Sequence, residues 1–326
     1  MQAMKRRHWL ASTAALAVAP WVRAQGSDNW PSRPIRLVVP GPPGGGTDIL
    51  ARLLGEKLSA ALKQPVIIDN KPGANGMLAS AEVARAAPDG QTLLFSFASA
   101  MAINPSLYAR APDPVKDFEA VAQIGLTGNV LLASQNLPVR SFKELVAYAK
   151  ARPGELNYAS WGTGSGGHLT MESLLQRAGL RMTHVPYKGT APIIVDLLGG
   201  TLQLGWTDVS SPVQYIESGK LRALAVSGTQ RVPHMPQVPT LTEEGYPFET
   251  AGWYGVFAPA RTPVAIVERL NALVVATVGS PEFKARLDAL NLPNSPTPTA
   301  REFAQLVAKD TTTWRSILQG LGIKPE

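Results

Sequence analysis

The sequence predicts an α/β protein built of two similar lobes, and three observations support this prediction. Short runs rich in β-branched residues alternate with longer helical patterns, as in proteins whose helices cover parallel sheets. The order strand, glycine-rich loop and amphipathic helix occurs twice, at 35–62 and at 156–178. The length of 326 residues is enough for two domains of the usual size, about 100–150 residues each.

The first predicted series runs from residue 35 to residue 97. Ile35 to Val39 form a strand that Pro40 ends, and a Gly/Pro-rich loop follows. The next helix repeats leucine and isoleucine at three- and four-residue spacing up to Leu62, which is typical of one buried helical face. The rest of the series is a strand at 66–68, a turn-rich loop at 70–76, a helix at 79–87 and a strand at 91–97.

A second series begins near residue 130. Its helix at 141–152 has Ser141 at the N-cap and Glu144 at the capping-box position, and Gly179 ends its helix at 168–178. The predicted strands are 130–133, 156–160, 182–186, 202–206 and 221–226, and the last part of the chain adds a strand at 253–258 and helices at 263–278 and 299–318.

The two series suggest how the chain divides. The first lobe is predicted to hold residues 25–127 and to be completed by 251–326, while residues 128–250 form the second lobe. Two chain crossings, near 126–130 and 248–252, would then serve as the hinge.

The N-terminus has the three parts of a signal peptide, predicted at residues 1–24. A basic start at 5–7 precedes an apolar run from Trp9 to Ala19, and Val22-Arg23-Ala24 fits a small-x-Ala cleavage site. The run is shorter than the ~20 residues that a membrane span requires. The sequence therefore predicts export to the periplasm as a soluble protein, by either the Sec or the twin-arginine route.

Composition excludes several classes of function. The formal net charge of +7 is concentrated near the N-terminus, and without Lys5, Arg6, Arg7 and Arg23 the chain has 27 bases against 24 acids. That balance does not indicate a nucleic-acid partner. There is no cysteine, so disulfides, thiolate metal sites and a cysteine nucleophile are excluded. No cofactor or metal is expected.

The chemistry is predicted to lie in the two glycine loops, Pro40–Asp48 and Ser160–His168. Each joins the C-terminal end of a strand to the start of a helix, where unpaired N–H groups and the helix dipole favour an anion. In open α/β sheets the crevice beyond the strand ends is the usual ligand site. Glycine lets a ligand approach the backbone, although glycine also serves simple turns.

Enzymatic interpretations of these loops are weaker. The second loop satisfies a dinucleotide pattern, but Lys188 stands near the end of the next strand, where a ribose-binding acid would be expected. The first loop lacks the lysine of a phosphate-binding loop. Ser165 lacks the first glycine of a nucleophile elbow, and the histidines have no metal-ligand spacing. Lys188 itself is interpreted as a solvated loop residue.

Seven segments in order resemble the Bug-type receptors of tripartite tricarboxylate transporters, and they cover essentially the whole mature chain. They are PGPPGGGTDILAR at 40–52, NKPGANG at 70–76, LNYASWGTGSGGHL at 156–169, HVPYKGTAPIIVDLLGG at 184–200, GKLRALAV at 219–226, VPTLTEEG at 238–245 and WYGVFAPARTP at 253–263. The resemblance implies a periplasmic binding protein fold, type II-like, with two Rossmann-like lobes and a hinge of two strands.

The resemblance also implies the site. In that family main-chain groups of the first glycine loop hold a carboxylate, and the second loop supplies opposing contacts. By position, the candidates are Gly44, Gly45, Gly46, Thr47, Asp48, Ser160, Thr163, Gly164, Ser165 and His168, with Ala98, Ser99 and Asp208 added at the ends of other strands. Asp48 could instead be a first-turn residue, and Asp208 could either meet a ligand amine or cap a loop. Trp161 and Trp206 could wall the pocket or lie in the core.

The function expected on these grounds is that of a periplasmic, monomeric receptor rather than an enzyme, binding a small organic acid or an acidic amino acid. Membrane transporter subunits are its expected partners. A carboxylate-processing enzyme and a signalling receptor remain the alternatives. The sequence does not identify the ligand, because recognition by main-chain groups leaves little side-chain code.

Overall fold

The structure is a computed structural model that describes residues 30–228, 230–232, 234–247, 252–290, 292 and 299–323. Its contacts divide the chain into two units, Met1–Trp30 and Pro31–Glu326. The fold described here is that of the second unit. The predicted signal peptide, 1–24, lies outside the described residues.

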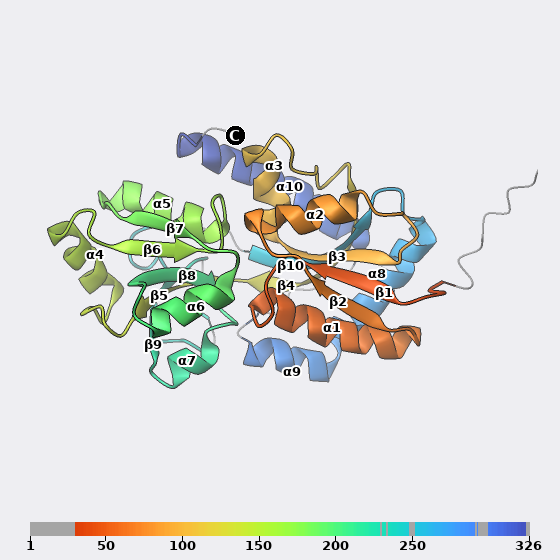
Figure 1. Ribbon diagram of the computed structural model, residues 1–326, viewed down its shortest axis with the longest axis horizontal. Helices are drawn as coiled ribbons and strands as arrows, with labels where there is room; N and C mark the ends of the chain where they lie inside the picture. Colours follow the sequence, from red (N-terminus) through yellow and green to blue (C-terminus); the bar gives the residue numbers. More distant parts are fainter. Residues whose placement is uncertain are drawn as a thin grey trace, which may run out of the picture. The chain divides into compact units, whose positions relative to one another are not determined.

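The second unit contains two five-stranded mixed sheets, each of which forms the centre of one lobe (Figure 1). The first sheet has the order β2-β1-β3-β10-β4, in which β1, β2 and β3 are parallel and β10 is antiparallel to both of its neighbours. Its strands are β1 (Ile35–Val39), β2 (Val66–Asn70), β3 (Thr92–Phe97), β4 (Phe118–Thr127) and β10 (Gly252–Pro259).

The second sheet repeats this topology in the order β7-β6-β8-β5-β9. Strands β6, β7 and β8 are parallel, and β5 is antiparallel to β8 and β9. The strands are β5 (Asn129–Ser134), β6 (Asn157–Ser160), β7 (Thr183–Pro186), β8 (Leu204–Asp208) and β9 (Leu221–Val226). Strand β6 therefore corresponds to β1, so the two glycine loops occupy equivalent places.

The helices follow the strands as in other α/β layers. The first lobe has η2 (Ala74–Gly76), α1 (Gly46–Leu62), α2 (Met77–Ala84), the π-helix η3 (Ser99–Ile103), α3 (Asn104–Leu107), α8 (Val264–Gly279) and α9 (Pro281–Ala289). The second lobe has α4 (Phe142–Ala151), α5 (Gly166–Ala178), α6 (Thr190–Leu198) and α7 (Val213–Glu217). The C-terminal helix α10 (Ala300–Gly320) packs on β4, η3 and α3 (Figure 1).

Local sequence explains why the main helices form and how α10 begins. In α1, Leu50, Leu54 and Leu58 are buried at four-residue spacing, so one face of the helix covers the sheet. Helix α10 begins with a complete capping box, in which Thr299 accepts from Glu302 N while the Glu302 carboxylate accepts from Thr299 N. Such boxes satisfy N–H groups that would otherwise lack a partner.

Helix α10 and α3 also join the core of the second lobe. Trp314 and Leu318 of α10, together with Ile103 and Leu107, belong to the same buried cluster as Leu131 and Trp206 of the second sheet. A separate cluster around Phe257 and Phe303 holds α10 to the first sheet. The lobes are therefore packed together along the side that carries α3 and α10.

The α/β class and two-lobe architecture predicted from the sequence are confirmed, but some elements were missed. Strand β4 and helices α3, α6, α7 and α9 were not predicted, and α2 begins two residues before the predicted helix. The predicted lobe boundaries, 25–127 with 251–326 and 128–250, stay a prediction, and residues 248–251 of the second crossing lie outside the described residues.

Among the residues described, no single helix is both long and apolar enough to cross a membrane. Helices α8 and α9 pass that test only as a pair, and they are bent by 68° relative to each other.

Candidate functional site

One cavity lies where the C-terminal ends of the parallel strands of both sheets meet. In the first lobe its walls come from the segments that follow β1, β2 and β3. In the second lobe they come from the segments that follow β6 and β7 and from the end of β8. This is the place where open α/β sheets usually bind ligands. The space open to the centres of water molecules is about 70 Å³. One water needs roughly 10–15 Å³ on that measure, so the cavity has room for several waters or a small organic molecule.

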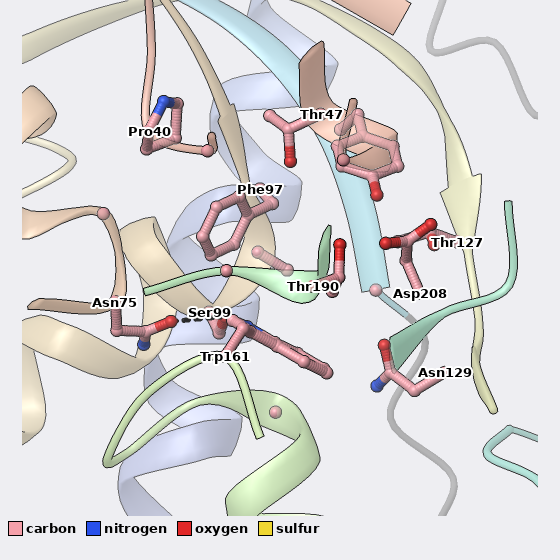
Figure 2. A pocket seen from close by; sticks show the side chains of 18 of the residues that line it. Pro40, Thr47, Asn75, Phe97, Ser99, Thr127, Asn129, Trp161, Thr190 and Asp208 are labelled. Carbon is pink, nitrogen blue, oxygen red and sulfur yellow. Dashed lines mark hydrogen bonds between the residues drawn. The ribbon is translucent and has the colours of Figure 1, made fainter. Parts of the chain in front are cut away.

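The first glycine loop contributes Gly41, Pro42, Gly45 and Thr47 to the wall. Gly45 and Thr47 were predicted as site residues, and Figure 2 shows the Thr47 side chain at the cavity. Both lie at the N-terminal end of α1, whose dipole favours negative charge.

Asp48 does not line this cavity, although it was a candidate. Its Oδ2 accepts hydrogen bonds from Gly44 N at 2.9 Å and from Arg52 Nε at 2.9 Å, and its Oδ1 accepts from Asn70 Nδ2 at 3.0 Å. Burial acts to raise the pKa of Asp48, but the hydrogen bonds from Arg52, Gly44 and Asn70 outweigh it and lower the pKa. Asp48 therefore holds the loop that carries Gly45. Gly44 also lies away from the wall.

The segment after β3 brings Ala98 and Ser99 to the cavity, as predicted by position. Ser99 Oγ donates to Asn75 Oδ1 at 3.3 Å (Figure 2). The Asn75 amide in turn donates to Asn104 Oδ1 at 2.9 Å. Asn75 has a φ of 49°, within the left-handed region, which its short polar side chain tolerates. A set of hydrogen-bonded polar side chains from the first lobe thus reaches the cavity.

The second glycine loop meets the cavity only through Trp161 and Gly166. Five predicted residues of this loop do not line it: Ser160, Thr163, Gly164, Ser165 and His168. Thr163, Gly164 and His168 line a smaller, separate hollow beside Tyr108 and Ile323. Trp206, the other tryptophan considered for the wall, is fully buried in the core.

Behind this loop lies a partly buried polar cluster around His168 and His184. The two rings stack with centroids 4.1 Å apart, and Tyr158 stacks on the other face of His184 at 5.0 Å. Ser160 Oγ is 2.7 Å from His184 Nε2, and Gly164 N donates to His168 Nδ1 at 3.1 Å. Burial first, and then the neighbouring His168, lowers the pKa of His184 to about 3. Both rings therefore stay neutral at physiological pH and hold the loop in shape.

The segment after β7 supplies residues that the sequence analysis did not select. Lys188, Gly189 and Thr190 line the cavity at the N-terminal end of α6. Lys188 is exposed, and within the described part of the chain it forms no ion pair within 4.0 Å. Lys188 stands just after the end of a parallel strand, as Ser99 does. That position in the sequence is the signal that could have identified Lys188 as a candidate.

Asp208 lines the cavity from the end of β8 and is only 7% exposed. Its Oδ1 accepts from Ser210 N at 3.0 Å, from Ser211 N at 2.8 Å and from the Ser210 hydroxyl. Its Oδ2 accepts from Ser211 Oγ at 2.8 Å. Of the two roles considered for Asp208, capping of the following loop is thus present in the structure.

Tyr254 of β10 closes the cavity next to the first crossing. The side chains of Thr127, Thr47 and Ser210 lie close to its hydroxyl. Burial first, and then the charge of Asp208, raises the pKa of Tyr254 well above its usual value, so the phenol remains neutral. Thr127 also belongs to the wall, and its register partner on β10 is Gly252.

Several hydrogen bonds link the two lobes directly. They are Gly46 N to Ser211 Oγ at 2.7 Å, Asn75 Nδ2 to Gly164 O at 3.4 Å, Trp161 Nε1 to Ser99 Oγ at 3.4 Å and Tyr108 OH to Thr163 O at 3.2 Å. Gly46 is thus not on the wall but in contact with the opposite lobe.

The cavity has few charges. Among the described residues that line it, Lys188 is the one cation and Asp208 the one anion, while the other polar side chains carry hydroxyl, amide or indole N–H groups. Helices α1, α2, α5 and α6 and the π-helix η3 begin at its wall. No group of three or more His, Asp or Glu side chains within the described ranges could hold a metal ion. Such a site suits a small anion held by neutral donors.

The chain is similar to known proteins along most of its length. Residues 50–323 match the family described as tripartite tricarboxylate transporter family receptor. The protein BugT of Bordetella pertussis is 37% identical over 304 residues, which cover 91% of this chain and 92% of BugT.

Solved structures agree with this match. R. palustris Rpa4515 with adipate is 36% identical, with a TM-score of 0.87 and coverage of 91% of this chain and 100% of that one. The periplasmic binding protein BugD is 32% identical, also with a TM-score of 0.87 and with the same coverage of both chains. The chain therefore belongs to the receptor family of the tripartite tricarboxylate transporters.

Proposed function

We propose that this protein binds a small carboxylate, an organic acid or an acidic amino acid, between its two lobes in the periplasm. The bound anion is then passed unchanged to membrane transporter subunits. The protein is proposed to act as a monomer, because residues of both lobes of one chain together line the cavity.

The observation that carries this proposal is the convergence of strand ends and helix N-termini from both lobes on one cavity. Such N-termini bind anions without a cluster of basic side chains. The walls offer hydroxyls and amides from both lobes, at Thr47, Ser99, Thr190 and Asn129. A ligand that contacts both lobes is favoured over one that contacts a single lobe.

The N-terminus of α6 is the best place for the ligand carboxylate. Its N-cap is Gly189, which provides no side-chain cap, and Lys188 stands next to it. By contrast, α1 already uses Gly46 N to contact Ser211, and α5 is capped by Ser165. Helix α2 continues from η2, and the N–H groups of Gly76 and Met77 already donate to the carbonyls of Gly73 and Ala74. Of the candidates, Gly45, Thr47, Ala98, Ser99 and Asp208 are proposed to contact the ligand, while Gly44, Gly46, Asp48, Ser160, Thr163, Gly164, Ser165 and His168 support the walls.

The relatives support a carboxylate ligand and a periplasmic location. Rpa4515 carries adipate, a dicarboxylate, and BugD is a periplasmic binding protein. The predicted signal peptide gives the same location, because a basic start, an apolar run and a cleavage site direct export.

One contact favours a second candidate function, a hydrolytic enzyme. Ser160 Oγ and His184 Nε2 are 2.7 Å apart, as in a serine nucleophile with its base. However, Ser160 is 0% exposed and neither residue lines the cavity. A pKa of about 3 also makes His184 a poor base near neutral pH. The pair therefore fits a structural role better than a catalytic one.

A thermal-shift screen of dicarboxylates, tricarboxylates, acidic amino acids and aromatic acids tests the proposal. A ligand present at 100 times its dissociation constant should add about 2.7 kcal/mol to the free energy of unfolding. The same mixtures, analysed by mass spectrometry after incubation, should return the ligand unchanged. Failure of every acid to stabilise the protein, or chemical conversion of one that binds, would reject the receptor function.

A further inference from the structure

Asp208 places a negative charge directly over the N-terminus of α1. A Cβ added to Gly46, the first residue of α1, would lie less than 3.0 Å from the Asp208 carboxylate. Ser211 Oγ connects the two, because it accepts from Gly46 N at 2.7 Å and donates to Asp208 Oδ2 at 2.8 Å. The positive end of α1 is thus already occupied by a carboxylate of this chain.

The Asp208 carboxylate still has room to accept a hydrogen bond. A carboxylate offers about four acceptor positions, two on each oxygen. Within the described residues, Oδ1 accepts three hydrogen bonds and is full, whereas Oδ2 accepts only one, from Ser211, and keeps its second position. No cation of the described chain forms an ion pair with Asp208. Figure 2 shows Asp208 on the same side of the cavity as Thr127 and Asn129.

These contacts decide what part of a ligand can face Asp208. A second carboxylate there would be repelled at short range by a charge that is almost fully buried. A hydroxyl or ammonium group would instead donate to Oδ2, and hydrogen bonds to charged acceptors are the stronger kind.

The distance between Asp208 and the α6 terminus sets the position of that donor. Ser211 Oγ touches both places, at 3.3 Å from Thr190 Oγ1 and 2.8 Å from Asp208 Oδ2. The two places are therefore no more than two hydrogen bonds apart. The carbon next to the carboxylate is the nearest one that can carry a donor, so a donor there suits this short separation best.

We propose that Asp208 is a specificity-determining residue that selects carboxylates carrying a hydroxyl or ammonium group on the adjacent carbon. This inference rests on the proposed function, because it assumes a carboxylate at the N-terminus of α6. It divides possible ligands by one substituent: 2-hydroxy and 2-amino acids are accepted, and the unsubstituted acids of the same length are disfavoured.

Calorimetric titration with two matched series tests the inference. The first series is succinate, malate and aspartate; the second is glutarate, 2-hydroxyglutarate, 3-hydroxyglutarate and glutamate. The wild-type protein should bind the 2-substituted member of a series at least about tenfold more tightly than the unsubstituted acid. 3-Hydroxyglutarate should bind no better than glutarate within about threefold.

The variant Asp208→Asn should reduce the preference to within about threefold, because the amide oxygen still accepts but carries no charge. Asp113→Asn is the matched control. Asp113 also caps a loop, accepting from Val115 N at 2.9 Å and from Lys116 N at 3.2 Å, but it does not line the cavity. The readout is the ratio of two affinities within one variant, so partial loss of stability in Asp208→Asn does not affect it.

The outcomes are separable. Equal affinity for glutarate and 2-hydroxyglutarate in the wild type, or a preference that survives in Asp208→Asn, overturns the role of Asp208 and leaves the carboxylate receptor intact. A wild-type protein that binds none of the seven acids, and none in the wider screen, overturns the proposed function itself.

Discussion

At the scale of single residues, the glycines of the site are required because they let one lobe approach the other. An added Cβ at Gly45 would lie 3.2 Å from Thr190 Oγ1, and one at Gly162 would lie 3.4 Å from Asn75 N. A side chain at Gly189 would overlap Pro42 of the first loop. These glycines thus let the backbone of one lobe come close to the other lobe. The sequence had suggested only that they let a ligand come close to the backbone.

The substitution Gly46→Ala should separate the lobes without unfolding either one. The new methyl group would overlap Asp208 and Ser210, while the helical backbone at the first position of α1 accepts alanine. Overpacking of this kind costs about 1–3 kcal/mol, so ligand affinity should fall by roughly tenfold or more. Calorimetry and thermal unfolding together measure both quantities.

Gly279→Ala provides the control for that variant. Gly279 ends α8, and an added Cβ there would meet nothing within 4 Å. Its ligand affinity should equal that of the wild type. If Gly46→Ala behaves in the same way, contact between α1 and Asp208 does not limit closure.

The stacked histidines predict a loss of stability in mild acid. The pKa of His184 is about 3 in the folded protein against 6.5 ordinarily, so below pH 6.5 the unfolded chain takes up a proton that the folded protein does not. The stability present above pH 6.5 is therefore lost as the pH falls toward 3, by up to about 1.4 kcal/mol per pH unit for this residue. Urea unfolding at pH 7 and pH 4.5 should show a smaller difference in His184→Gln than in the wild type.

His234→Gln is the matched control, because His234 is exposed and lies outside the stack. It should keep the pH dependence of the wild type. The same dependence in His184→Gln would mean that the stack does not govern stability in this range.

The sequence predicted some site residues and could not have predicted others. Gly45, Thr47 and Ser99 follow from the rule that ligands meet the C-terminal ends of parallel strands. Asn75 and Lys188 also follow the C-terminal ends of parallel strands, β2 and β7, but in the sequence each stands in a polar loop that is also typical of an ordinary turn. That Ser165 and His168 face away from the cavity depends on the packing around His184, 16 residues further along the chain than His168, and no local pattern encodes such a contact.

At the scale of elements, the sequence predicted helices and strands whose hydrophobic pattern is continuous. It did not predict those whose pattern is interrupted. The leucines of α1 repeat without a break, so that helix was predicted. Strand β4 has two register irregularities against β10, which disturb its alternation of inward and outward residues. Helix α6 carries Pro192 in its first turn and β-branched residues after it, so its sequence favours a helix only once it packs on β8.

Two helix caps offer a matched test of how α5 serves the site. Ser165 caps α5 by accepting from His168 N, and Thr299 caps α10 by accepting from Glu302 N. Ser165→Ala and Thr299→Ala should each lower the free energy of unfolding by about 1 kcal/mol. Only Ser165→Ala should also weaken ligand binding, by about threefold or more, because α5 begins at the cavity wall beside Trp161.

Urea unfolding and calorimetry of both variants provide the comparison. Equal affinities would mean that the start of α5 does not position the wall. A loss of affinity in Thr299→Ala as well would indicate a general effect of lowered stability.

At the scale of the whole molecule, the lobes are held together unequally on the two sides of the cavity. Trp314 and Leu318 of α10 and Leu107 of α3 are buried in the core of the second lobe. Around the cavity itself the lobes meet through single hydrogen bonds, such as that from Gly46 N to Ser211 Oγ. Opening should therefore be a rotation that keeps the side of α10 in contact and breaks the contacts of the glycine loops, as in hinge motion between domains.

Ligand-induced closure is the prediction that follows from this asymmetry. A ligand that contacts Thr47 of one lobe and Thr190 of the other gains both contacts only when the lobes approach, so it binds the closed form more tightly and increases its population. Small-angle scattering should then give a smaller radius of gyration with ligand than without it. The chain has no cysteine, so the double variant Gly45→Cys/Thr190→Cys can be crosslinked specifically to supply the dimensions of the closed form. The ligand-bound wild type should have the radius of gyration of the crosslinked protein, and the free wild type should have a larger one. Equal radii with and without ligand would contradict closure as the signal that a transporter recognises.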